Sequence, residues 1–297
     1  MVRGRGAFVL FVQQLINGIA QGSLFALLAI SFAIVYGVMR LVNFATGSLY
    51  MIGAFSGFFI VRYVVRDVFV AIFAGAVAGY IVAFVLEKLA FKALRGVARI
   101  ASLICTIGFS VFLNELAAVL FGSEVKSMPA FYGQTAFRIT GVAVSWLQVV
   151  MVATAATVLI ILQLFIYKTK MGLAIRTVSL DYRTAALMGI NVDRTISIAF
   201  SIAGAMAGIA GVLAAVYYNA VAFNMGNLPG LKSFSAAVFG GLTSIPGAIV
   251  GGYLLGIIEN FGVQIISTGY RDIIGFIVLV AFLLFRPRGI LGRKTSM

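Results

Sequence analysis

Residues 6–39 read GAFVLFVQQLINGIAQGSLFALLAISFAIVYGVM, an unbroken run without a charged side chain. A helix crosses the hydrocarbon core of a bilayer in about 20 residues, so this run is longer than one membrane span requires. Similar uncharged runs follow along the rest of the chain, at 69–86, 100–114, 139–167, 195–231 and 233–258. The pattern predicts an all-α, polytopic membrane protein.

The composition excludes several other classes of protein. The chain is 62% hydrophobic and 10% charged, against about 25% charged residues in a soluble domain. It has no His and a single Cys, Cys105. The commonest metal ligand and general base are therefore missing, and neither an intramolecular disulfide nor a cysteine metal cluster can form. We expect no metal site and no enzymatic activity.

About eight transmembrane helices are predicted, some of them broken or re-entrant. Residues 1–297 form a single transmembrane domain, because the largest polar segment, 168–194, is too short for a core of its own. The expected spans are 10–37, 46–62, 68–88, 100–121, 142–167, 196–218, 234–264 (with a break) and 271–286.

Basic clusters predict the orientation. Lys and Arg concentrate at 88–99, 168–194 and 286–294, which the positive-inside rule places in the cytoplasm. The same rule explains the net charge of +14 without a nucleic-acid partner. The N-terminal side stays open, because Arg3 and Arg5 favour the inside whereas three spans before the first cluster favour the outside.

The loop 168–194 predicts a short helix from Ala174 to Met188. Gly189 suits the left-handed position after a helix end, and Asn191 can cap the next span. Such a helix is shaped to dock a partner. The alternative is a basic amphipathic loop that lies on anionic lipid headgroups.

Two polar interruptions, at 40–53 and 240–247, fall in apolar runs, one in each half of the chain. In lipid, an irregular backbone is tolerated only against protein or a water-filled cavity, and paired broken helices point to a translocation path. Each interruption could equally be a plain turn between helices. The intramembrane carboxylate Glu259 is a further candidate. The path candidates are Asn43, Thr46, Gly47, Ser48, Thr243, Ser244, Pro246 and Glu259.

The inner loop carries a pattern of small and charged residues. Gly172-x-Ala174-x-Arg176-x4-Asp181-x3-Ala185-x3-Gly189 resembles the signature of permease subunits in ABC importers. More narrowly, the chain resembles LivH-type permeases of the branched-chain amino acid ABC importer family. Further segments that carry this resemblance lie at 14–27, 36–54, 201–212, 232–252 and 286–292.

The resemblance implies partners as well as a role. Segment 172–191 would be the coupling helix in a cleft of a cytoplasmic ATPase, with Arg176, Asp181 and Arg183 as charged contacts. The chain lacks a Gly-x4-Gly-Lys-Ser/Thr phosphate loop, so ATP would bind on partner subunits and no cofactor on this chain. The implied partners are a related second permease, two ATPase subunits, a periplasmic substrate-binding protein and membrane lipid.

The resemblance also implies cargo and location. We expect an importer of branched-chain or other apolar amino acids in the bacterial inner membrane, working by alternating access. Related permeases that carry urea or short amides look similar. A rival from another class is a secondary transporter or channel for a small polar solute, in which Glu115 and Glu259 couple transport to protons or Na⁺.

Overall fold

The computed structural model describes residues 2–92, 99–129, 131, 137–139, 142–265, 267–285 and 289–291. Parts of the predicted basic clusters, at 93–98, 286–288 and 292–297, lie outside the described residues. The helices are α1 (Val2–Met39), α2 (Thr46–Tyr63), α3 (Val68–Leu86), the π-helix η1 (Glu87–Phe91), α4 (Arg99–Phe121), α5 (Trp146–Lys168), α6 (Lys170–Leu180), α7 (Tyr182–Leu187), α8 (Val192–Tyr218), α9 (Asn227–Gly240), α10 (Ile245–Ile265), the 3-10 helix η2 (Thr268–Tyr270) and α11 (Arg271–Phe285).

Two short antiparallel strand pairs accompany the helices. β1 (Lys126–Ser127) pairs with β4 (Ala220–Val221), and β2 (Phe137–Ile139) pairs with β3 (Val142–Val144). The predicted span 142–167 therefore starts too early. The helix begins at Trp146, because Ser145 and Gln148 form a reciprocal capping box at its first turn.

The prediction of an all-α polytopic membrane protein is confirmed, but the count of eight spans is not. Among the described residues, six helices are long and apolar enough to cross a membrane. They are α1, α3 with η1, α4, α5, α8 and α10. Of the other predicted spans, α2 has 18 residues and ends on Arg62 and Tyr63, and α11 has 15 residues.

The expected break in 234–264 is confirmed. α9 ends at Gly240, Gly241 follows with a φ of +111°, and α10 starts at Ile245. Positive φ suits glycine, which has no Cβ to clash. α9 also starts earlier than predicted, at Asn227, so that it is a short helix of 14 residues.

The first and second halves of the chain pack on each other reciprocally. α1 lies antiparallel to α10, since Gly18 faces Ile257 and Gly22 faces Tyr253. α3 lies antiparallel to α8, with Gly79 against Gly204. These are the most extensive helix pairs of the fold. Thus α1, the first helix of the first half (α1–α3), packs on α10, the third helix of the second half (α8–α10). In the same way α8, the first helix of the second half, packs on α3, the third helix of the first half.

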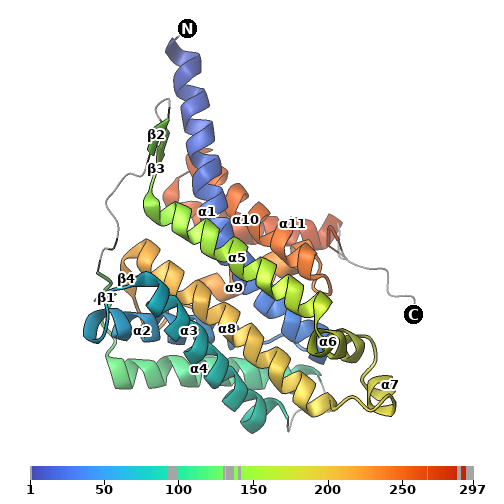
Figure 1. Ribbon diagram of the computed structural model, residues 1–297. Coiled ribbons are helices and arrows are strands. Elements are labelled where there is room, and N and C mark those ends of the chain that lie inside the picture. The colour runs from blue at the N-terminus through green and yellow to red at the C-terminus, as the bar shows by residue number, and fades with distance from the viewer. Residues whose placement is uncertain are drawn as a thin grey trace.

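The two ends of the molecule are distinct (Figure 1). β1 and β4 lie at one end of the helices, and α6 and α7 lie at the other. The Arg40 guanidinium at the end of α1 donates to the Ser179 carbonyl of α6, at 3.0 Å. α1 thus runs toward the α6 end, and its start lies at the opposite end. Because α8 leaves the α7 end, the first helices of the two halves run in opposite directions, as in an inverted repeat.

Candidate functional site

The segment 170–189 forms two helices instead of the single predicted one. Asp181 interrupts the predicted helix with an extended backbone, φ −152° and ψ +117°. Its carboxylate accepts the backbone N–H groups of Arg183 and Thr184 and so caps α7. The prediction of one helix from Ala174 to Met188 is wrong, because a side chain that caps the next helix favours a break.

Small and apolar side chains hold this segment against the membrane helices. Ile175, Val178 and Ala185 are buried in the core of the protein. Gly172 packs against backbone carbonyls of α5 at Phe165 and Ile166, where a Cβ would collide. Ala185 is the one buried residue of α7, so that nearly the whole helix stands free of the fold.

The outward face of the segment is largely apolar. The exposed fractions of Leu180, Leu187 and Met188 are 77%, 88% and 77%, and Tyr182 is 57% exposed. Arg183 is exposed beside them, and its guanidinium carbon lies over the Tyr182 ring, 5.9 Å from the ring centroid. We call Leu180, Tyr182, Arg183, Leu187 and Met188 the α7 tip. Exposed apolar clusters of this kind mark contact surfaces.

The other predicted coupling residues hold the segment in shape. The Arg176 guanidinium lies over the Tyr167 ring, 5.1 Å from its centroid. The Thr184 hydroxyl, and then the Arg183 backbone N–H, lower the pKa of Asp181 by hydrogen bonding to its carboxylate. Gly189 has a φ of +78°, and Asn191 caps α8 by accepting the Arg194 N–H; both predictions are confirmed. Ala174 is partly buried.

The first predicted interruption forms a buried turn between α1 and α2. The Asn43 side chain accepts the Ala45 N–H at 3.0 Å, and the Thr46 hydroxyl donates to the Asn43 carbonyl at 2.9 Å. Gly47 then meets Gly226 backbone to backbone. The starts of α2 and α9 therefore touch each other in the middle of the fold.

A row of hydrogen-bonded polar side chains lies next to that contact. The Ser48 hydroxyl donates to Asn114 Oδ1 at 3.0 Å, and Asn114 Nδ2 donates to Asn227 Oδ1 at 2.8 Å. Ser110, Asn114 and Asn227 line a cavity of about 380 Å³ between α4 and the two helix starts. Asn43, Thr46, Gly47 and Ser48 are thus brought together at one junction.

The second predicted interruption lies elsewhere. Thr243, Ser244 and Pro246 lie at the turn from α9 to α10, where the Ser244 hydroxyl accepts the Gly247 N–H at 3.2 Å. Since α9 has 14 residues, this turn lies about 20 Å along the helix from the Gly226 contact. The two interruptions do not form one site in this conformation.

Glu259 belongs to a buried ion cluster. Lys232 Nζ of α9 lies 2.8 Å from Glu259 Oε1 of α10 and 2.7 Å from Asp272 Oδ1 of α11. Gln21 of α1 donates to Glu259 Oε2 at 3.1 Å. A Cβ on Gly275 would lie 2.7 Å from Glu259 Oε1, so the glycine leaves room for the carboxylate. The cluster ties α1, α9, α10 and α11 together.

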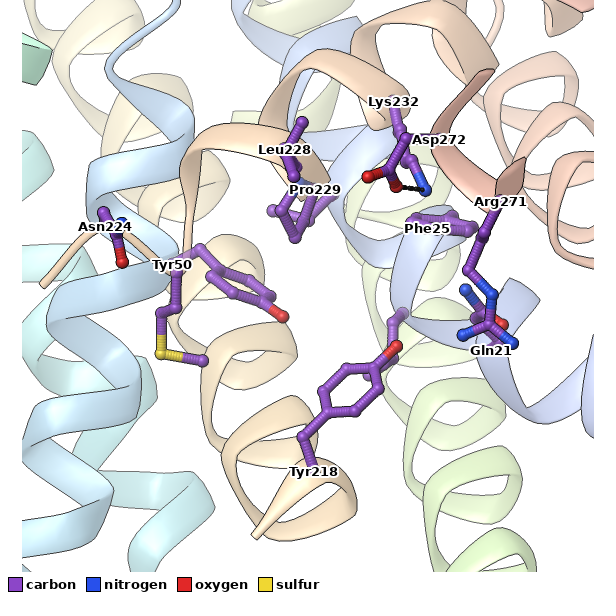
Figure 2. Close-up of a pocket in the computed structure, with 13 residues that line it drawn as sticks. Gln21, Phe25, Tyr50, Tyr218, Asn224, Leu228, Pro229, Lys232, Arg271 and Asp272 are labelled. Carbon is purple, nitrogen blue, oxygen red and sulfur yellow. Dashed lines mark ion pairs between the residues drawn. The ribbon is translucent and has the colours of Figure 1, made fainter. Parts of the chain in front are cut away.

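The cluster borders a second cavity, of about 330 Å³. Figure 2 shows the hydroxyl groups of Tyr50 and Tyr218 pointing into this space, with Arg271 and Gln21 on the side opposite Tyr50. Arg271 Nε is buried and has no hydrogen-bond partner among the described residues. We call this space the charged cavity. Its lining residues are Gln21, Leu24, Phe25, Leu28, Tyr50, Tyr218, Asn224, Met225, Leu228, Pro229, Lys232, Arg271 and Asp272.

The family model described as "Branched-chain amino acid transport system / permease component" matches residues 14–283. The chain belongs to this permease family. The permease protein BraD of Pseudomonas aeruginosa, of a high-affinity branched-chain amino acid transport system, is 36% identical over 95% of this chain and 96% of its own length. The LivH permease protein of Escherichia coli is 36% identical over 96% and 97%.

A more distant relative matches over nearly the same length. The probable LivH permease protein of Methanocaldococcus jannaschii is 29% identical over 93% of this chain and 91% of its own. No solved structure matches the chain significantly. Within the described residues, no group of three or more His, Cys, Asp or Glu side chains is placed to hold a metal ion.

Sequence reasoning took Arg271 and Asp272 for an interfacial pair, and it placed neither Lys232 nor the apolar part of the α7 tip at a site. Lys232 separates two long uncharged runs and opens the segment 232–252; a lone Lys between such runs signals a buried partner. The exposure of Leu187 and Met188 depends on tertiary packing, which the sequence pattern does not contain. Glu115, by contrast, is exposed on α4 and lines neither cavity.

Proposed function

We propose that this chain is a membrane-spanning permease subunit of an ATP-driven importer for branched-chain or other apolar amino acids, in the bacterial inner membrane. The match of a permease family over residues 14–283 carries the proposal. Relatives that are 36% identical over nearly the full length are named for branched-chain amino acid transport. A periplasmic binding protein would deliver the cargo, and a related second permease would complete the path.

The α7 tip is the docking surface for a cytoplasmic ATPase subunit in this proposal. α7 projects from the fold with Ala185 as its buried residue, and Leu187 is 88% exposed. A short helix with an apolar face suits a groove on a partner. Arg183 at its edge supplies a charge for orientation. ATP binds to the ATPase subunits, and this chain holds no cofactor.

A mechanical connection leads from the docking surface to the centre of the fold. Arg40 ties α6 to the end of α1, and the turn from Asn43 to Thr46 leads to the Gly47–Gly226 contact. Movement of α6 and α7 by the ATPases would therefore shift the starts of α2 and α9. The polar junction around Ser48 and Asn114 is the segment of the path that this shift opens and closes.

The rival hypothesis, a secondary transporter coupled through Glu115 and Glu259, gains no support from Glu259. Glu259 is fully buried and is held by Lys232 at 2.8 Å and Gln21 at 3.1 Å. A buried ion pair of this kind connects helices. A coupling carboxylate would instead have to exchange its ion with water on both sides.

Co-purification in mild detergent tests the docking surface. An ATPase subunit identified by mass spectrometry should accompany the tagged wild-type chain. It should be lost from an Arg183→Glu, Leu187→Ser variant, because the variant reverses the charge and removes the apolar contact of the α7 tip. The matched control is Val125→Ser, Lys126→Glu at the start of β1, where Val125 is 66% exposed. Equal ATPase recovery in the wild type and the α7-tip variant would contradict the proposal.

A further inference from the structure

We propose that the charged cavity binds a free α-amino acid as a zwitterion, with the ligand carboxylate on Arg271 and its ammonium on Asp272. This inference rests on the proposed function and assigns a place on this chain to its cargo. The opposite charges of Arg271 and Asp272 and an apolar wall line the same space of about 330 Å³.

The cationic side of the cavity calls for an anion. Lys232 already holds two carboxylates, those of Glu259 and Asp272. Arg271 brings a second positive charge, and its Nε is buried without a hydrogen-bond partner among the described residues. An unsatisfied buried donor of a charged group costs stability. Arg271 lines the cavity, and its guanidinium fork matches the two oxygens of a ligand carboxylate.

The acidic side of the cavity provides the site for the ammonium. Asp272 Oδ1 lies 2.7 Å from Lys232 Nζ, and the Asp272 side chain is 50% exposed. A carboxylate has several acceptor positions, so Asp272 can receive an ammonium while it keeps the bond to Lys232. A simple anion would be repelled by the negative charge of Asp272. A simple cation would be repelled by the positive charge of Arg271. The pair therefore favours a dipolar ligand.

The remaining wall takes an apolar side chain. Leu24, Phe25 and Leu28 of α1 line one side, with Met225 and Leu228 before and within α9. The first three are at most 5% exposed. Ligand pockets span about 300–1,000 Å³, so this cavity is at the small end of the range. It fits a single amino acid with a compact apolar side chain.

Binding of three related probes to the purified transporter complex tests the inference. L-leucine carries both charges, leucinamide lacks the carboxylate and 4-methylpentanoate lacks the ammonium. We expect the wild type to bind L-leucine at least about tenfold more tightly than either analogue, the loss typical of one charged hydrogen bond. Arg271→Gln should weaken L-leucine about tenfold and leave leucinamide unchanged. Asp272→Asn should weaken L-leucine similarly and leave 4-methylpentanoate unchanged.

Controls separate recognition from folding. Arg271→Lys keeps the charge and should recover part of the affinity for L-leucine, whereas Arg62→Gln, an exposed charge on α2, should bind all three probes as the wild type does. Each variant is accepted only when its melting temperature and elution volume match the wild type. If Arg271→Gln alone fails this check, Asp272→Asn and Arg271→Lys decide.

The outcomes distinguish this inference from the proposed function. Wild-type import of L-leucine with unchanged probe preference in the Arg271 and Asp272 variants overturns the cavity assignment alone. Equal weakening of all three probes in both variants also overturns it, because a merely structural role has that effect. Absence of L-leucine import by the wild-type complex overturns the proposed function, and the binding data still decide the cavity.

Discussion

Gly208 sets the distance between α3 and α8 at the centre of the fold. A Cβ there would collide with the Gly75 carbonyl, and close backbone approach through small residues is how membrane helices pack. A Cβ added to Gly108 on α4 would instead point into open space. The two glycines are therefore a matched pair for testing the packing.

We predict opposite results for alanine at these two positions. Gly208→Ala should lower the free energy of unfolding by about 1–3 kcal/mol, the cost of overpacking a core. Gly108→Ala should leave it unchanged or raise it by up to about 1 kcal/mol, because alanine is the better helix former. Thermal denaturation in detergent, followed by size-exclusion chromatography, checks both. Equal melting temperatures for the two variants would contradict the packing described for α3 and α8.

Lys232 holds two acidic side chains that would otherwise face each other near the charged cavity. Lys232→Met should destabilise the protein by about 3–5 kcal/mol, because it leaves a buried carboxylate without its counter-ion. The double variant Lys232→Met, Glu259→Gln should be less destabilised than Lys232→Met alone. A double-mutant cycle on melting temperatures measures this coupling.

The control for this cycle is a surface ion pair. Lys92 and Asp193 lie 3.3 Å apart with side chains 52% and 59% exposed, so Lys92→Met should cost less than about 1 kcal/mol. If Lys232→Met were as mild as Lys92→Met, the ion cluster would not connect α9, α10 and α11 as described.

At the scale of elements, hydrophobic runs predicted the helices better than their ends. The boundary at Thr46 and the break before Ile245 follow from polar residues and glycines in apolar runs. The capping box that delays α5 to Trp146 and the cap of Asp181 that divides α6 from α7 depend on short-range side-chain bonds that compete with helix continuation. The hydrophobic periodicity of the sequence alone does not predict where such bonds end a helix.

The sequence likewise predicted one part of the candidate site and not another. Motif spacing led to the 172–189 segment and to the polar turn at Asn43. The pairing of Lys232 with Glu259 and Asp272, and the convergence of Tyr50 with Tyr218 on one cavity, join residues from helices far apart in the chain. Such contacts arise only from tertiary packing, so the charged cavity was beyond sequence reasoning.

The cap of α7 gives a pH prediction. The pKa of Asp181 is lowered from 3.8, chiefly by the Thr184 hydroxyl. A carboxyl whose folded pKa is depressed stabilises the fold above its unfolded pKa, and this contribution is lost as pH falls through the folded pKa. α7 should therefore be equally ordered from pH 5 to pH 8 and loosen only below about pH 4.

Amide hydrogen exchange of residues 182–187 checks this prediction, after correction for the intrinsic pH dependence of exchange. Asp181→Ala should exchange on the order of fivefold faster at pH 7, from loss of the N-cap. Thr169 also caps a helix, α6, but it does not ionise. Thr169→Ala should loosen α6 by the same amount at every pH tested, and a loosening of wild-type α7 between pH 5 and pH 8 would contradict the account.

At the scale of the whole molecule, two inverted halves surround a junction of helix starts. One end carries α6 and α7, and the other carries β1 and β4 (Figure 1). The start of α1 lies at the end opposite α6, so the side of the N-terminus is opposite to the side on which α6 lies. If the basic α6–α7 end faces the cytoplasm, as the positive-inside rule predicts, the proposed function has ATP on that side and the cargo delivered at the other.

The central claim is that ATP hydrolysed at the α6–α7 end drives amino-acid import through this chain. The most direct test is uptake of labelled L-leucine by proteoliposomes that contain the complete transporter complex and its binding protein. We predict uptake only when ATP is present on the side that exposes the α7 tip, and its loss in the Arg183→Glu, Leu187→Ser variant. Uptake of L-leucine by this chain alone, without ATP, would contradict the account.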